Sequence, residues 1–211
     1  MSAKQRALVA RGVHWVQAAR DARRPIVLFT DDNDTTHVRD AVAVGADLVV
    51  AQGAEAGGHG ATRGTLSLVP EVADHLATHA PDTLLLAAGG IGDGRGLAAA
   101  LMLGADGVLL GTRLWAAHEA LVSPGHHDAI VSTPGDGTLR TTVADIARQI
   151  DWPQGYTARI RRNAFTDRWH GHEAELLSQI ETEGPKYRQA FCVCISFPYL
   201  FVFHNCVIYP R

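Results

Sequence analysis

The chain has 211 residues, of which 46% are hydrophobic and 19% are charged, and its formal net charge is -3. This composition excludes a disordered or collagen-like chain and allows a sizeable core. The slightly acidic balance offers no general basic field for nucleic acid or anionic lipid. All three cysteines lie after residue 190, which excludes a disulfide-stapled secreted scaffold, and the first 25 residues show no signal peptide. We therefore expect a cytoplasmic protein.

Four short apolar runs predict strands that are buried on both faces of a parallel sheet. These runs are residues 26–30, 48–52, 84–88 and 108–110. Helices are expected before the first run and between the others, at residues 4–22, 36–44, 70–78 and 94–103. This alternation of strands and helices predicts an α/β fold with right-handed crossovers, either an open sheet or half of an eight-stranded barrel.

The remainder of the chain differs in composition from these first 122 residues. Residues 123–189 have fewer apolar runs and indicate a small lid segment, with helices expected at 142–150 and 169–181. Residues 190–211 form an atypical tail, because positions 190–210 contain no Asp, Glu, Lys or Arg. Membrane contact is one interpretation of the tail, but Pro198, His204 and Asn205 argue against a span. A tail foreign to the fold is the favoured interpretation, and it would be an aggregation hazard if exposed.

The sharpest motif follows the second expected strand and runs from Gln52 as Q-G-A-E-A-G-G-H-G. Ligands of parallel α/β proteins bind beyond the carboxyl ends of the strands, where the Gln52 amide can donate and accept hydrogen bonds. Gly57 and Gly58 let the backbone approach a flat or anionic ligand closely. His59 adds an imidazole that can titrate near neutral pH. A glycine-rich turn with a surface histidine is the alternative interpretation.

Two more glycine-bearing segments follow the third and fourth expected strands. Gly89 and Gly90 precede the helix expected near residue 94, and bare amides at a helix N-terminus can bind an anion. This segment matches neither a Rossmann nor a Walker loop, and a simple helix cap is its alternative interpretation. The last segment offers two backbone amides and a hydroxyl. It consists of Leu109, Leu110, Gly111 and Thr112. Such loops after adjacent strands match the phosphate site of many barrels.

Taken together, these blocks resemble the nitronate monooxygenase family, once called 2-nitropropane dioxygenases. The resemblance rests on residues 51–59, 87–96, 104–112 and 160–169, and it extends over about residues 20–180. It implies an FMN-containing TIM barrel with a small second domain that oxidises alkyl nitronates to carbonyl compounds and nitrite with dioxygen. The chain is then expected to hold the C-terminal half of the barrel in residues 1–122, the lid segment in 123–189 and the tail in 190–211.

The resemblance also implies roles for individual residues. His59 is the expected catalytic histidine beside the flavin, and Gln52 and Gly57 are expected to contact the flavin, with Gly58 next to them. The phosphate is expected at the later glycine loops. These residues are Gly89, Gly90, Leu109, Leu110, Gly111 and Thr112. A missing N-terminal half leaves two open sheet edges, at residues 26–30 and 108–110, through which copies could associate.

The remaining polar and histidine-rich segments give weak evidence for a metal site. Residues 31–34 (D-D-N-D) favour a solvated polar turn over a cation loop, and His126-His127 and His170-Gly171-His172 lack the further ligands of a zinc site. We therefore expect no metal. Two other functions stay open at this point: an NAD(P)H:quinone reductase on the same flavin frame, and a non-catalytic half barrel. The expected partners are a small nitronate or nitroalkane and dioxygen, with no nucleic acid and no membrane.

Overall fold

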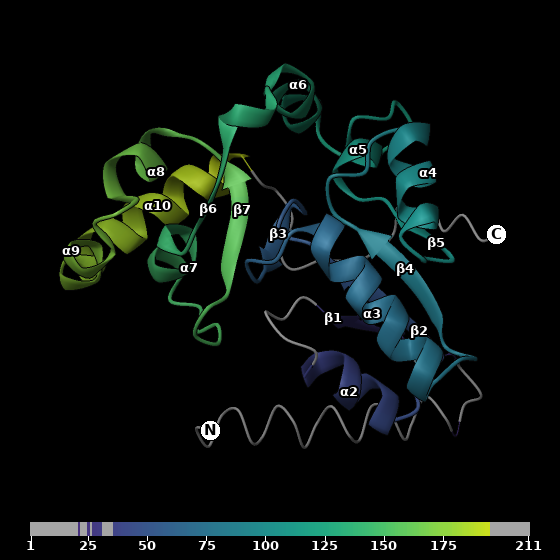
Figure 1. The fold of residues 1–211 in the computed structure, drawn as a ribbon. Helices are drawn as coiled ribbons and strands as arrows, with labels where there is room; N and C mark the ends of the chain where they lie inside the picture. Colours follow the sequence, from purple (N-terminus) through teal and green to yellow (C-terminus); the bar gives the residue numbers. More distant parts are fainter. Residues whose placement is uncertain (1–20, 22–24, 26, 31–35, 195–211) are drawn as a thin grey trace.

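The computed structural model describes residues 21, 25, 27–30 and 36–194 (Figure 1). Most of the helix expected at 4–22, the polar turn at 31–34 and the tail beyond Cys194 lie outside the described residues. Among the helices of the described part, none combines the length and the apolarity that a bilayer crossing requires.

A four-stranded parallel sheet forms the first part of the described chain. Its strands are β1 (Val27–Thr30), β2 (Leu48–Gln52), β4 (Leu84–Ala88) and β5 (Gly107–Leu109). They lie in the order β1-β2-β4-β5, so each strand pairs with the strand of this sheet that follows it in the chain. This sequential parallel order is that of a barrel segment. The four expected strands are confirmed, with the last one beginning and ending one residue earlier than expected.

Three helices connect these strands and cover one face of the sheet (Figure 1). They are α2 (Thr36–Ala43), α3 (Thr65–His79) and α4 (Gly94–Met102). Val49 and Leu85 point to this face and are buried against Val69 of α3 and its neighbours. Val50 and Leu86 are also buried, but in a separate cluster on the opposite face. The strands are therefore apolar on both faces, as their unbroken hydrophobic runs predict.

A second sheet, which the sequence did not predict, joins the lid segment to the barrel part. Its antiparallel strands are β3 (Gly58–Gly60), β7 (Thr157–Arg161) and β6 (Thr138–Thr141), in the order β3-β7-β6. Only β6 and β7 come from the lid segment, whereas β3 belongs to the glycine-rich motif that follows β2. Figure 1 shows β3 between the two parts. The lid segment is thus anchored on the very motif that the sequence marks as a candidate site.

Further helices follow β5, most of them short and most of them within the lid segment. They are α5 (Thr112–Trp115), α6 (Pro124–Ser132), α7 (Val143–Arg148), α8 (Ala164–Trp169), α9 (Glu173–Ser178) and α10 (Ile180–Cys194), with a 3-10 turn at Gly135–Gly137. The single helix expected at 169–181 is wrong, because Gly171 adopts a φ of +85° between α8 and α9. Helix α7 lies at the centre, where Val143 packs on Trp169 and Leu176.

Candidate active site at the strand ends

The three glycine-bearing motifs start side by side at the edge of the parallel sheet that is formed by the carboxyl ends of its strands. Gln52 at the end of β2 is in register with Ala88 at the end of β4, and Ala88 is in register with Leu109 at the end of β5. Because the strands are parallel, the segments that follow all leave the same edge of the sheet. The strand ends therefore bring the three sequence motifs together, as the sequence analysis expected.

The loops also contact one another beyond the strands. The Gly53 amide donates to the Ala88 carbonyl at 2.9 Å, which joins the first loop to the second strand end. A Cβ added at Gly57 would lie 3.0 Å from Thr112 Oγ1, so the first motif also reaches the third. Gly58 has open space beside it, and Leu109 and Leu110 are half-buried in the two sheet-face clusters.

Gly89 is a point of close approach between two of these loops. Its φ is +104°, and a Cβ there would lie 2.9 Å from the Ala56 nitrogen and 3.0 Å from the Gly53 oxygen. Gly90 follows with a φ of +72°. Only glycine fits such a backbone at a close approach of two loops without strain.

Unused backbone donors lie at the ends of the second and third motifs. Within the described part of the chain, the amides of Gly90, Ile91, Gly111 and Thr112 donate no hydrogen bond. Thr112 is exposed and adds its hydroxyl to this set. Backbone amides without an acceptor in the described part of the chain, together with an exposed hydroxyl, are suited to an anionic group.

Two amides in the first turn of α4 are already used, contrary to the expectation of bare amides there. The Asp93 carboxylate accepts hydrogen bonds from the amides of Arg95 (3.0 Å) and Gly96 (3.2 Å), which caps the helix. The Arg95 side chain pairs with the same carboxylate. The Arg95 guanidinium, followed by the Gly96 amide, holds the pKa of Asp93 below its usual value. A capping side chain therefore uses the donors that an anion would need.

His59 lies in β3 and is held at three points. Its carbonyl accepts a hydrogen bond from the Gln52 side chain at 2.8 Å, which ties it to the end of β2. Its Nε2 lies 2.9 Å from Asp145 Oδ2, and the exposed fractions of the two side chains are 12% and 6%. The Trp152 ring stacks on the imidazole with centroids 3.8 Å apart and planes 13° from parallel. The imidazole is therefore a fixed group and not a surface side chain on a flexible turn.

Arg140 of β6 holds the first motif from the lid side. Its guanidinium donates to the carbonyls of Ala54 (3.0 Å), Gly60 (2.6 Å) and Thr157 (2.7 Å). Arg159 of β7 also donates to the Ala54 carbonyl, at 3.1 Å. Fixed, planar guanidinium donors suit several carbonyls at once. The lid segment therefore sets the shape of the glycine-rich loop and the position of His59.

Asp145 is surrounded by the core of the lid segment. It lies on α7 among buried residues, and Tyr187 of α10 packs against the neighbouring Ala144 and Ala147. Burial raises the pKa of the Tyr187 hydroxyl; the charge of Arg148 opposes this shift and that of Asp145 adds to it. The carboxylate that contacts His59 is thus part of a packed interior.

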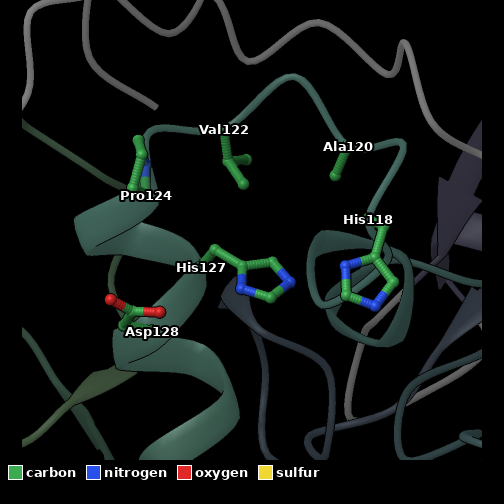
Figure 2. Close-up of a pocket in the computed structure, with 6 residues that line it drawn as sticks. All are labelled: His118, Ala120, Val122, Pro124, His127 and Asp128. Carbon is green, nitrogen blue, oxygen red and sulfur yellow. The ribbon is translucent and has the colours of Figure 1, made fainter.

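The other histidine pairs do not form a metal site in the described part of the chain, where no group of three potential ligands is found. A cavity of about 210 Å³ lies between α6 and the loop that joins α5 to α6, and His118 and His127 face each other across it (Figure 2). His127 Nε2 is 3.2 Å from the Ala116 carbonyl, and His126 Nδ1 is 2.6 Å from Ser123 Oγ. His170 Nδ1 lies 3.1 Å from Thr141 Oγ1.

Sequence reasoning missed three residues that shape the site. Asp145 lies in an expected helix, Trp152 in the loop that follows that helix, and Arg140 in a strand that was not expected. Each is more than 75 residues from the motif it contacts, as the separation of 86 between His59 and Asp145 illustrates. No local pattern in a single sequence marks such a pairing.

A family model and two curated relatives that match this chain carry the same name. A family model described as nitronate monooxygenase matches residues 17–182. Nitronate monooxygenase npaC of Metarhizium robertsii is 43% identical over 184 residues, which cover 82% of this chain and 50% of that protein. A nitronate monooxygenase of Neurospora crassa is 42% identical over 149 residues, which cover 67% of this chain and 39% of that protein. The chain thus spans half or less of the length of these curated relatives.

Two solved structures resemble this chain, which again covers about half of each. FabK from Thermotoga maritima matches with a TM-score of 0.67 and 30% identity, over 80% of this chain and 49% of that one. Nitroalkane oxidase from Streptomyces ansochromogenes matches with a TM-score of 0.62 and 28% identity, over 85% of this chain and 51% of that one. The expected fold class, α/β with about half of a TIM-type barrel and a small lid, is confirmed.

Proposed function

The chain belongs to the nitronate monooxygenase family, and from this premise we propose that it forms part of an FMN-dependent oxidoreductase acting on alkyl nitronates. The observation that carries the proposal is the contact of three glycine-bearing loops at one sheet edge, with His59 fixed beside them. Ligands of parallel α/β folds bind at this edge.

The residues at this edge fit a flavin mononucleotide. The phosphate would be held by the segments after β4 and at the end of β5, which include unused amides and the Thr112 hydroxyl. The proposed phosphate residues are Gly89, Gly90, Leu109, Leu110, Gly111 and Thr112. Gln52, Gly57 and Gly58 would lie against the ring, since an amide and a backbone without Cβ atoms allow a flat group to approach. We further propose that residues 1–122 carry the cofactor and that residues 123–189 position His59.

The proposed role of His59 is to handle a proton or a negative charge of the substrate. As a neutral imidazole it would accept the proton from the α-carbon of a nitroalkane, and as an imidazolium it would steady the nitronate oxygens. The flavin, when bound, supplies the electron transfer and the oxygen chemistry. In the overall reaction, two nitronate anions and one dioxygen give two carbonyl compounds and two nitrite ions.

The deciding experiment begins with an absorption spectrum of the purified chain, with and without added FMN. A flavin band that remains after gel filtration, together with oxygen consumption on a nitronate, would support the proposal. Oxidation of NADH by a quinone, without any activity on nitronate, would instead assign a reductase to the same frame. A colourless chain that elutes as a dimer would favour a non-catalytic half barrel that pairs through its outer strands, β1 and β5.

The variant His59→Asn tests the catalytic assignment. We expect turnover to fall by about 10²-fold or more, because proton transfer by a positioned side chain contributes about that much, while FMN stays bound. His118→Asn is the matched control, since His118 is exposed and lies on the α5–α6 cavity. Loss of flavin from His59→Asn would make His59 a structural residue and contradict the assignment.

A further inference from the structure

We propose that Asp145 is a positioning residue that fixes the ring orientation and the tautomer of His59, so that Nδ1 is the nitrogen that exchanges a proton with the substrate. The proposal rests on the catalytic role proposed for His59. It assigns to the lid segment a specific chemical task at the active site, which the glycine-rich motifs alone cannot perform.

The first part of the argument is the direction of the hydrogen bond. Asp145 Oδ2 lies 2.9 Å from His59 Nε2. An ionised carboxylate only accepts hydrogen bonds, so the proton of this bond must belong to Nε2. In a neutral imidazole the other nitrogen, Nδ1, then carries the lone pair. Within the described part of the chain Nδ1 makes no hydrogen bond, so its lone pair has no partner there.

The second part is the rigidity of the pair. Asp145 is on α7, where it is 5% exposed and lies between the buried residues Ala144 and Ala147. The Trp152 ring, stacked at 3.8 Å, prevents the imidazole from tilting out of its plane. The Gln52 side chain holds the His59 main chain at 2.8 Å. These three contacts restrict both the side chain and the backbone of His59, as catalytic preorganisation requires.

The third part is that an unpaired polar atom is buried at this position, which destabilises the fold. Asp145 Oδ1 is buried and has no hydrogen-bond partner in the described structure. Buried polar atoms are paired in most proteins, because an unpaired one loses its hydration without compensation. A packed apolar residue would avoid this cost on α7. A carboxylate directed at the imidazole accounts for the presence of a charged group at this buried site.

The tautomer can be measured directly by long-range proton–nitrogen NMR on the chain labelled with ¹⁵N-histidine. The chain has 11 histidines, and the His59 signal is assigned as the one that disappears in His59→Gln. At a pH of about 9, well above the usual titration range of histidine, we expect the Nε2–H tautomer. An Nδ1–H tautomer in the unmodified chain would overturn the proposal without any variant of Asp145.

Two variants then separate positioning from simple stability. In Asp145→Asn the amide can donate or accept, so the tautomer preference should be lost, and kcat should fall by about 10²-fold or more with a smaller change in KM. Asp145→Glu keeps an acceptor and should restore the Nε2–H signal and part of kcat. Asp136→Asn is the control for a carboxylate changed to an amide, because Asp136 is exposed in the Gly135–Gly137 turn. Circular dichroism confirms that each variant is folded.

The outcomes keep this proposal distinct from the proposed function. If the chain has no activity on nitronate but Asp145→Asn still redistributes the tautomers, the function fails and the positioning role stands. If His59→Asn abolishes turnover while a folded Asp145→Asn keeps both its kcat and the Nε2–H tautomer, the positioning role is refuted and the function stands. If Asp145→Asn does not fold, the NMR results for the unmodified chain and for Asp145→Glu decide.

Discussion

Replacing Gly89 by alanine tests whether the approach of two loops at the strand ends is as tight as the structure indicates. Gly89 has a φ of +104°, and the new Cβ would lie 2.9 Å from the Ala56 nitrogen, 3.0 Å from the Gly53 oxygen and 3.1 Å from Thr65 Oγ1. Two of these atoms belong to the backbone and cannot rotate away. Either the loop that carries Ala56 must move or Gly89 must change its conformation.

The size of the effect follows from two contributions. A left-handed backbone costs an L-residue about 1–2 kcal/mol, and forcing a methyl group into a packed position costs about 1–3 kcal/mol. Together they give about 2–5 kcal/mol of destabilisation. For a chain of this size, about 3 kcal/mol corresponds to a decrease in Tm of about 6–12 °C. Displacement of Ala56 would also disturb Gly57, so we expect weaker FMN binding in the same variant.

The assay is thermal and urea unfolding of Gly89→Ala beside Gly92→Ala. Gly92 is in the same loop, but its φ is not positive and a Cβ there would have no atom within 4 Å. Gly92→Ala should therefore stay within about 1 kcal/mol of the unmodified chain. Equal stability and equal FMN binding of the two variants would refute the close approach of the loops, whereas equal stability with weaker FMN binding in Gly89→Ala alone would restrict the effect to the site.

Two further predictions concern the lid segment. Arg140→Lys keeps the charge but loses the planar donors to Ala54, Gly60 and Thr157. We expect urea unfolding to show that the free energy of unfolding falls by about 2–4 kcal/mol. Arg161→Lys, at an exposed position, is the control, and a similar decrease in that variant would contradict the stabilising role of the Arg140 hydrogen bonds. The hydrogen bond from Lys186 holds the pKa of Glu183 below its usual value, so its stabilisation is present above a pH of about 4.5 and is lost as the pH falls through the lowered pKa. Thermal unfolding of Glu183→Gln should therefore depend less on pH between about 5 and 3, and an unchanged pH dependence would contradict the assignment.

The parallel sheet and its helices could be predicted because their signal is local. Runs such as 48–52 and 84–88 are apolar without polar alternation, and this pattern is required of strands covered on both faces. The lid sheet could not be predicted in this way. Its first strand, Gly58–Gly60, contains two glycines and one histidine, which is a composition with low strand propensity. Pairing with β7 and the guanidinium of Arg140 stabilise it.

For the candidate site, the sequence alone determined that the three glycine loops follow neighbouring strand ends and that His59 belongs to the first loop, because parallel strands place the residues that follow them at a common edge. It also indicated a helix that begins near residue 94, but the structure showed that the Asp93 side chain caps this helix through the amides of Arg95 and Gly96. The partners of the imidazole, Asp145 and Trp152, were decided by tertiary structure only. They reach His59 through packing of α7 and the following loop against β3, and such long-range packing leaves no periodic pattern in the chain.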